Sequence, residues 1–329
     1  MNASTGNLLE VKNLFVQYTS GGQVIHAVNG VSFSLKPGAT LGLVGETGAG
    51  KTSAAKAIMR ILPDPPAKVT GGEIFFNGQD ILRASENEML KIRGGKISMI
   101  FQDPMTALNP VMTIGSQIAE VIRTHNNISK READERAVEM LNMVGIVEER
   151  FNEYPFQFSG GMKQRVVIAM GLACKPKLLL ADEPTTALDV TIQAQVLEMV
   201  NDLKKQLNTA MILITHDLGV VAEMCDEVAV MYAGEIIESG TKEEIFDHPS
   251  HHYTIGLFNS LPSFAVGESR LHPIDGLPPN PTNLPVGCRF FERCSYATPE
   301  CSIGEVPYQA VAEGHYCRCL HPAQREVRR

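Results

Sequence analysis

The stretch Gly45-Glu-Thr-Gly-Ala-Gly-Lys-Thr52 decides the fold of this 329-residue chain. It fits the pattern G-x-x-x-x-G-K-[ST] of a phosphate-binding loop. It also lies where such a loop must lie, between a predicted strand, Thr40–Val44, and a predicted helix, Lys51–Leu62. The glycines allow backbone N–H groups to close around phosphates, and the helix N-terminus adds its positive end. We therefore expect nucleotide phosphates to bind here.

Individual side chains of this loop have distinct expected roles. Lys51 supplies a positive charge to the β- and γ-phosphates, and Thr52 offers its hydroxyl to Mg²⁺, with Ser53 next in line. The predicted nucleotide-binding residues of the loop are Gly45, Glu46, Thr47, Gly48, Ala49, Gly50, Lys51, Thr52 and Ser53.

Composition and charge exclude several classes of protein. The 37 acidic residues against 29 basic ones give a net charge of −8, and no basic run appears, so we expect no nucleic-acid partner. The longest apolar stretch, Val166–Cys174, is about half the ~20 residues that a membrane-spanning helix needs. The polar N-terminus shows no secretory signal, so we expect the chain to be in the cytosol.

Short β-branched runs alternate with helical patterns up to about residue 255, which predicts an α/β domain. The segment Pro104–Tyr154 contains helical patterns but no convincing strand, and we interpret it as an inserted helical subdomain. Strands are predicted at Leu8–Val16, Thr40–Val44, Ile97–Phe101, Leu178–Ala181, Met211–Thr215 and Glu227–Tyr232. Helices are predicted at Lys51–Leu62, Thr113–Arg123, Lys130–Val144, Gly161–Cys174, Ile192–Leu207 and Leu218–Met224.

Two carboxylates follow an apolar strand in the run Leu178-Leu-Leu-Ala-Asp-Glu183. Asp182, at the strand end, can bind Mg²⁺ through its hydration shell, and Glu183 can polarise an attacking water. Two acids after a buried strand are by themselves most often part of a solvated loop. Together with a phosphate-binding loop they indicate a hydrolytic site.

A third motif, Phe158-Ser-Gly-Gly-Met-Lys-Gln-Arg165, opens the predicted helix Gly161–Cys174. Ser159 is a good N-cap, and the glycines Gly160 and Gly161 leave backbone amides open to a second anion. The motif resembles the signature sequence of the ATP-binding-cassette (ABC) ATPases. Met162 stands where that family usually has glutamine, a variant of its peptide-importer branch.

Other family elements follow in the same chain order. Tyr18 resembles the aromatic residue that stacks on adenine, and Gln102 the glutamine that links Mg²⁺ and water to the helical subdomain. Asp189 resembles the loop acid at the dimer interface, and His216 the histidine that contacts the γ-phosphate. Each residue alone has an ordinary structural explanation, such as a half-buried strand aromatic or a surface amide.

The resemblance covers residues 8–255, and the run Phe101–Gly115 narrows it to ATPase subunits of dipeptide/oligopeptide importers. It implies an α/β fold with a RecA-like core, an antiparallel β subdomain and a helical subdomain at about residues 104–158. The expected ATPase domain is 1–255, followed by an irregular, cysteine-rich extension, 256–329. Glu183, His216 and Lys51 are the implied catalytic residues, and Mg²⁺ is implied to bind through Thr52, Gln102 and Asp182.

The resemblance also implies partners. ATP closes a head-to-tail sandwich of two ATPase subunits, and Ser159, Gly160, Gly161 and Met162 contact the ATP of the other subunit. The second ATPase is a paralogue or another copy of this chain. Two transmembrane permease subunits and an extracytoplasmic peptide-binding protein complete the importer, which implies a peripheral location at the cytoplasmic face of the inner membrane. The alternative is a soluble ABC ATPase of nucleic-acid repair or translation.

The tail has a different composition. Nine of the 19 prolines lie between Pro262 and Pro322, a density that predicts irregular structure. Five of the seven cysteines also lie in its last 42 residues. Because cytosolic thiols stay reduced, this cluster indicates a metal before a disulfide. Cys174 and Cys225, which lie outside the tail, are interpreted as small buried apolar residues.

Spacing alone leaves the tail metal open. The gaps of 5, 6 and 17 residues between Cys288, Cys294, Cys301 and Cys319 are wider than in ordinary zinc ribbons, and four thiolates could equally hold a [4Fe–4S] cluster. The tail resembles the C-terminal extension of the same importer ATPases, which implies the cluster; Zn²⁺ and free thiols or disulfides are the alternatives. Cys317 is an alternative to Cys319 as fourth ligand. The trio His248, His251 and His252 is interpreted as a solvated loop.

Overall fold

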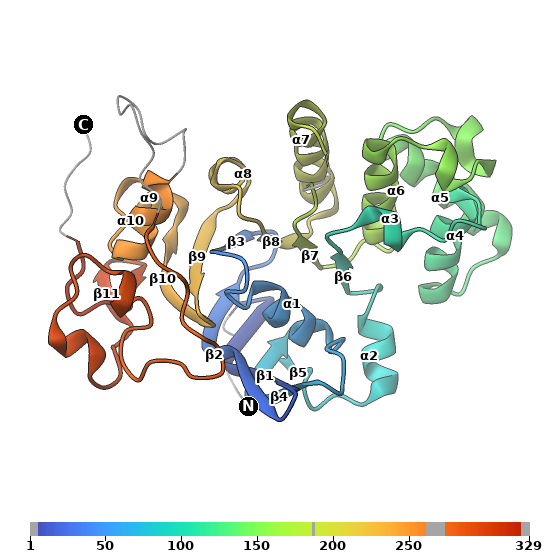
Figure 1. The fold of residues 1–329 in the computed structure, drawn as a ribbon. Helices are drawn as coiled ribbons and strands as arrows, with labels where there is room; N and C mark the ends of the chain where they lie inside the picture. Colours follow the sequence, from blue (N-terminus) through green and yellow to red (C-terminus); the bar gives the residue numbers. More distant parts are fainter. Residues whose placement is uncertain (1–5, 186–187, 261–273, 324–329) are drawn as a thin grey trace. The chain divides into compact units, whose positions relative to one another are not determined.

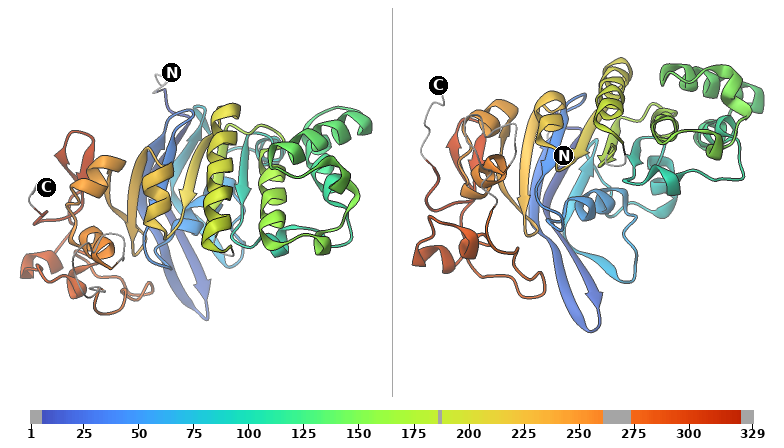
Figure 2. Two further views of the ribbon diagram at one scale, coloured as in Figure 1. Left: turned by 90° about the horizontal axis from the view of Figure 1, so that it is seen from above. Right: turned by 45° about the horizontal axis from the view of Figure 1, so that its top comes forward.

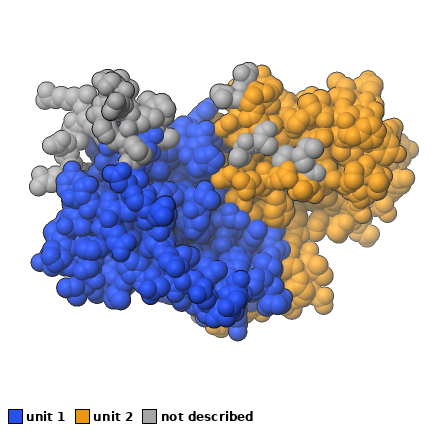
Figure 3. Space-filling view, in the orientation of Figure 1, with its two compact units in different colours: residues 1–35, 41–82, 214–329 blue, residues 36–40, 83–213 orange. Residues whose placement is uncertain are grey.

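The computed structural model describes residues 6–185, 188–260 and 274–323. The chain divides into two compact units (Figure 3). The first unit comprises residues 1–35, 41–82 and 214–329, and the second comprises residues 36–40 and 83–213. The phosphate loop and the cysteine-rich tail both belong to the first unit, whereas the carboxylate strand and the signature motif belong to the second.

An antiparallel sheet opens the first unit and is drawn in blue and cyan in Figure 1. Its strand order is β2-β1-β4-β5. The strands are β1 (Leu9–Ser20), β2 (Gln23–Leu35), β4 (Ala67–Phe76) and β5 (Gln79–Asp80). The register of β1 against β4 shifts at a bulge, where Gly72 has a φ of +96° and a Cβ would lie 2.4 Å from the carbonyl oxygen of Asn13. Only glycine fits this close approach of two strands.

The other strands of the first unit follow the order β11-β12-β10-β9-β3. They are β3 (Thr40–Val44), β9 (Glu227–Tyr232), β10 (Glu235–Thr241), β11 (Gln309–Ala312) and β12 (His315–Cys317). β3 and β9 are parallel, and the other pairs are antiparallel. Most of the tail is irregular, as expected from its prolines, but β11 and β12 extend the sheet at β10 (Figure 1). The proline density did not predict these two strands.

Helices complete the first unit. They are α1 (Lys51–Met59), α8 (Leu218–Met224), α9 (Lys242–Asp247) and α10 (His252–Asn259), with 3₁₀ turns at Phe291–Arg293 and Pro299–Ser302. α1 ends three residues before its predicted end because Arg60 adopts a left-handed conformation, with φ of 51°. α10 crosses the expected boundary at residue 255, and the division of the chain into 1–255 and 256–329 stays a prediction.

The second unit has three neighbouring strands and most of the helices. β6 (Ile97–Ile100) pairs in parallel with β7 (Leu178–Asp182), and the next strand in the order is β8 (Ala210–Ile214), whose last residue belongs to the first unit. The helices are α2 (Glu86–Ile92), α3 (Pro104–Ala107), α4 (Ile114–His125), α5 (Lys130–Met143), α6 (Gly160–Leu172) and α7 (Val190–Leu207), with 3₁₀ turns at Glu148–Asn152 and Pro155–Gln157. α4, α5 and α6 pack side by side (Figure 2).

The predicted strands and helices are all present, within a few residues at each end. Besides β11 and β12, the elements that were not predicted are β2, β4, β5, β10, α2, α3, α9 and α10. Within the described ranges, no helix has both the length and the apolar character needed to cross a membrane.

A buried carboxylate fastens the tail to the sheet. Glu238 of β10 is fully buried, and its side chain accepts hydrogen bonds from the backbone N–H groups of Ser250 and His251. The imidazole of His315, also fully buried, lies 2.8 Å from Glu238 through Nε2 and 3.2 Å from Glu244 through Nδ1. Buried polar contacts therefore help to hold β12 of the tail against β10.

We expect Glu238→Ala to lower the free energy of unfolding by about 3 kcal/mol, because it leaves two amides and an imidazole buried without their acceptor. Urea denaturation followed by circular dichroism measures this loss. Glu243→Ala, which removes an exposed carboxylate from the first turn of α9, is the control and should change little. Equal losses in the two variants would contradict the anchoring role.

Candidate functional site

The phosphate loop joins β3 to α1 through three glycines with positive φ: 144° at Gly45, 83° at Gly48 and 100° at Gly50. A Cβ at Gly45 would lie 2.1 Å from the carbonyl oxygen of Met231, and one at Gly50 would lie 2.3 Å from that of Ala27. The loop therefore lies directly against the backbone of β9 and β2. Any larger residue at Gly45 or Gly50 would force it away.

Lys51 is buried at the start of α1 and turns back over the loop. Its ammonium Nζ donates to the carbonyl oxygens of Gly45, at 2.6 Å, and of Glu46, at 2.9 Å. No side chain caps the first turn of α1, whose N-cap is Gly50. Backbone N–H groups and a lysine thus converge at one helix N-terminus, an arrangement suited to an anion.

Three further residues that the sequence assigned to the nucleotide or its Mg²⁺ lie in the first unit. The hydroxyl of Tyr18 in β1 is 3.1 Å from the hydroxyl of Ser53 in α1, so the aromatic ring lies next to the loop. His216 is exposed immediately after β8. Thr52 occupies the second position of α1.

A contact that the sequence did not predict holds the second residue of the loop. The backbone N–H of Glu46 donates to the hydroxyl of Tyr253 in α10, at 2.9 Å, and its carboxylate binds the guanidinium of Arg293 from the tail. These partners are 207 and 247 residues away along the chain, and no local pattern signals them.

The carboxylates of the second unit follow β7 as predicted. Asp182 is buried at the end of the strand, and Glu183 adopts a left-handed conformation, with φ of 48°. The side-chain amide of Gln102, which follows β6, donates to the carboxylate of Glu183 at 2.8 Å. The structure thus brings two of the predicted residues together. The strained backbone at Glu183 is typical of a functional position.

The signature motif and the interface loop each begin a helix of the second unit. Ser159 is the N-cap of α6 and accepts from the N–H of Met162, and both Ser159 and Gly160 are exposed. Asp189 is the N-cap of α7 and accepts from the N–H of Ile192 at 3.0 Å. A Cβ at Gly161 would lie 2.7 Å from Ile192, so this glycine lets α6 approach α7.

Comparisons with known proteins show the family to which the chain is similar. A family model described as ABC transporter matches residues 28–186. The chain is 53% identical over 320 residues to the oligopeptide transport ATP-binding protein OppD of Bacillus subtilis (strain 168). This match covers 96% of this chain and 89% of that protein. It is 49% identical over 321 residues to the dipeptide transport ATP-binding protein DppD of the same organism, covering 97% and 96%.

The chain belongs to the ABC transporter ATPase family. A solved structure, the dimeric ABC transporter cassette MJ0796, superposes with a TM-score of 0.64 at 28% identity and covers 71% of this chain and 98% of that one. A second family model, described as oligopeptide/dipeptide transporter, C-terminal region, matches residues 237–301. This ABC ATPase therefore has the family's fold, followed by a C-terminal region similar to that of oligopeptide/dipeptide transporters.

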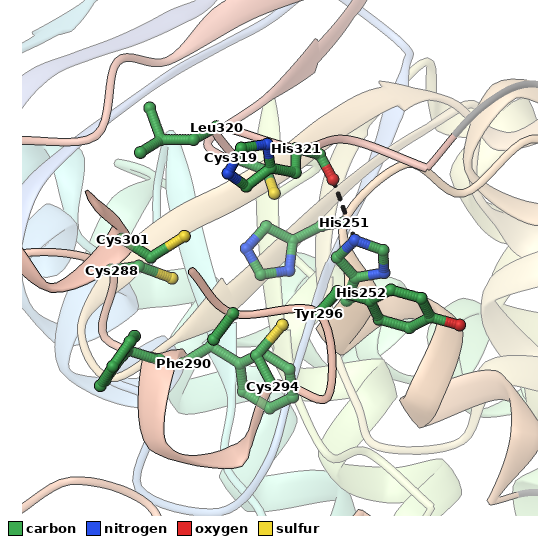
Figure 4. A pocket seen from close by; sticks show the side chains of 12 residues that line it. His251, His252, Cys288, Phe290, Cys294, Tyr296, Cys301, Cys319, Leu320 and His321 are labelled. Carbon is green, nitrogen blue, oxygen red and sulfur yellow. Dashed lines mark hydrogen bonds between the residues drawn. The ribbon is translucent and has the colours of Figure 1, made fainter. Parts of the chain in front are cut away.

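The extension of this ABC ATPase gathers four cysteines around one small pocket (Figure 4). They are Cys288, Cys294, Cys301 and Cys319, together with His251, His252 and aromatic residues. Cys317 does not line the pocket; it is buried in β12 opposite Glu238. Among the described residues no His, Cys, Asp or Glu group has the arrangement of a metal site, and none of the seven cysteines, all within the described ranges, forms a disulfide.

The electrostatics of the pocket disfavour separate thiolates. Burial, with the nearby Cys294 and Cys301, raises the pKa of Cys288 to about 11, and burial together with the other three cysteines raises that of Cys319 to about 11. Burial likewise raises the pKa of Cys317. Without a cation among them, these thiols stay protonated at neutral pH.

The prediction of a solvated histidine loop is wrong for His251. This residue is buried, accepts from the N–H of Tyr253 at 3.0 Å as the N-cap of α10, and lies among the cysteines in Figure 4. Burial lowers the pKa of His251 to about 4, so it is neutral at physiological pH. His248 does not line the pocket. Of the other two cysteines, Cys225 is buried as expected and Cys174 is half-buried.

Alanine substitutions at Gly50 and Gly48 should have unequal effects on stability. Gly50→Ala should lower the free energy of unfolding of the nucleotide-free protein by about 3 kcal/mol, because it adds a backbone clash to the left-handed strain. Gly48→Ala, with open space around the new methyl group, should lower it by about 1 kcal/mol. Urea unfolding of both variants measures the difference. Equal losses would show that the clash with β2 is relieved by movement of the loop.

Proposed function

We propose that this ABC ATPase powers the import of dipeptides and oligopeptides by ATP-driven closure of a dimer. The observation that carries the proposal is that the likeness to peptide-transport ATP-binding proteins extends over 96–97% of the chain, through the ATPase fold and the C-terminal region alike. A soluble ABC ATPase of nucleic-acid repair has no comparable support, since the C-terminal region matches peptide transporters.

In the proposed mechanism the phosphate loop binds ATP. Lys51 exchanges its two carbonyl acceptors for the β- and γ-phosphate oxygens, and the backbone N–H groups at the start of α1 bind further phosphate oxygens. Tyr18, whose hydroxyl contacts that of Ser53, is assigned to stacking on adenine. Thr52, Gln102 and Asp182 are the residues that would hold Mg²⁺, which would neutralise charge on the phosphates when bound.

Hydrolysis is assigned to Glu183 and His216. Glu183 accepts a proton from the attacking water, and the Gln102 amide that donates to its carboxylate keeps that carboxylate oriented. His216, exposed after β8, contacts the γ-phosphate. The positive φ of Glu183 supports a functional role for this residue.

The signature motif acts on a second subunit in this proposal. Ser159 and Gly160 are exposed at the N-terminus of α6, where amides and helix dipole favour the phosphates of a partner-bound ATP. Asp189 lies at the same interface. The second ATPase is a paralogue or another copy of this chain. Two transmembrane permease subunits receive the motion, an extracytoplasmic binding protein delivers the peptide, and the ATPase lies peripherally at the cytoplasmic face of the inner membrane.

We further propose that the four cysteines of the pocket hold a [4Fe–4S] cluster, with Zn²⁺ as the alternative occupant. The donor set fits: four thiols line one pocket, and backbone hydrogen bonds at Phe290, Tyr296 and His321 favour the thiolate forms of Cys288, Cys294 and Cys319. The positive charge of bound metal would offset the burial and mutual repulsion that raise the thiol pKa values. The cluster would cross-link the segments of the tail that carry its four cysteines.

Glu183→Gln tests the proposed function. The variant should bind Mg-ATP with near-normal affinity and hydrolyse it at least about 100-fold more slowly, because the amide cannot accept the proton of water. It should therefore accumulate as a closed, ATP-bound dimer, which size-exclusion chromatography detects. Glu198→Gln, the same change at an exposed position of α7, is the control. Near-normal hydrolysis by Glu183→Gln would refute the assigned role.

Serine substitutions test the cluster and its ligands. Protein purified without oxygen should be brown and hold about four irons per chain. Cys319→Ser should lose most of this iron, whereas Cys317→Ser should keep it, since Cys319 lines the pocket and Cys317 does not. Metal analysis and visible absorption give the result. A colourless protein containing zinc would overturn the cluster, and iron loss in Cys317→Ser alone would reverse the ligand assignment.

A further inference from the structure

An arginine of the cysteine-rich tail binds the phosphate loop itself. Arg293 approaches Glu46 with both ends of its guanidinium: Nη1 lies 2.9 Å from Oε2 and Nη2 lies 3.1 Å from Oε1. This fork geometry is the strongest pairing that an arginine makes with a carboxylate. Both residues belong to the first unit, so the contact lies within one compact part of the molecule.

Contacts other than the pair with Glu46 also hold the guanidinium of Arg293 in place. Nε of Arg293 donates to the carbonyl oxygen of Asp275 at 3.0 Å, and Nη1 also donates to the hydroxyl of Tyr232 at 3.2 Å. The side chain is only 6% exposed, and it lies near the rings of Tyr232 and Phe290. A charge held in this way is screened less than one on an open surface.

Glu46 is held on its other sides as well. Its N–H donates to the hydroxyl of Tyr253, and its carbonyl oxygen accepts from the Lys51 ammonium. The rings of Tyr253 and Tyr232 pack with centroids 4.6 Å apart, so the two hydroxyls that contact the Glu46–Arg293 pair come from one aromatic cluster. One loop residue thus connects the lysine of the phosphate site to the tail.

We propose that Arg293 is a positioning residue for ATP binding: through Glu46 it holds the phosphate loop in its binding conformation, so that a correctly folded cysteine-rich tail raises the affinity for ATP. The inference rests on the proposed function, since it assumes that ATP binds this loop. Arg293 directly precedes Cys294, one of the four cysteines of the pocket. The position of Arg293, and with it the contact with Glu46, therefore depends on how the pocket is folded.

Another arginine of the tail provides a matched control. Arg318 also precedes a pocket cysteine, Cys319, and is partly buried, but it donates to the carbonyl oxygens of Val306 and Ile236 and has no hydrogen bond to the phosphate loop among the described contacts. Loss of either arginine removes a buried cation from the tail. Only loss of Arg293 removes a contact with Glu46.

The test uses the full-length chain and measures Mg-ATP affinity by fluorescence titration, and KM and kcat in the assembled transporter. Arg293→Gln should raise the Kd and the KM for ATP about 5- to 10-fold while changing kcat less than about twofold, because a charge-assisted pair is lost and the hydrolytic residues are untouched. Arg293→Lys should recover part of the affinity. Arg318→Gln should bind ATP as the unchanged protein does.

Glu46→Gln removes the same pair without altering the tail, and it keeps the test decisive if Arg293→Gln does not fold. The double variant should bind ATP no more weakly than either single variant, which is the non-additivity of a direct pair. Additive losses, or unchanged affinity in Arg293→Gln and Glu46→Gln, would overturn the inference.

Lys51→Ala separates the two proposals. If this variant binds ATP normally, the proposed function fails. If it is the only variant that loses ATP binding, only the role of Arg293 fails.

Discussion

The phosphate loop depends on backbone conformations that only glycine adopts without strain. At Gly45 and Gly50 a side chain would meet main-chain oxygens of β9 and β2, so the absence of a Cβ lets the loop lie against both strands. That position turns Lys51 back over the loop carbonyls. It also places Glu46 where Tyr253 and Arg293 can bind it. The contacts of the loop with the rest of the first unit therefore depend on these two close approaches of backbones.

Local patterns were sufficient for much of the fold. The buried strands and amphipathic helices on either side of the phosphate loop, of β7 and of the signature motif follow from runs of a few residues, and the structure confirms them. The same locality explains why motif residues such as Lys51, Asp182 and Ser159 could be recognised, since each stands at a strand end or a helix start. Their roles toward ATP stay predictions that the experiments above address.

The rest of the structure depends on contacts between distant segments. β11 and β12 form because β10, some seventy residues earlier, offers a strand to pair with, and no periodicity within the tail signals that partner. The fork between Arg293 and Glu46 is likewise non-local. Burial of His251 follows from the tail folding over α10, which the local sequence does not show. Cys317 and Cys319 differ because of where β12 ends. The strand holds Cys317 opposite Glu238 and stops before Cys319.

The span of 247 residues between Glu46 and Arg293 also has a consequence for biosynthesis. A ribosome releases the phosphate loop well before Arg293, and domains fold largely in the order in which they emerge. Until Arg293 leaves the exit tunnel, the loop lacks one of its fixed partners, and closing so long a separation is a slow, late event in folding. During synthesis the phosphate loop is therefore without its contact to the tail for the time needed to add 247 residues.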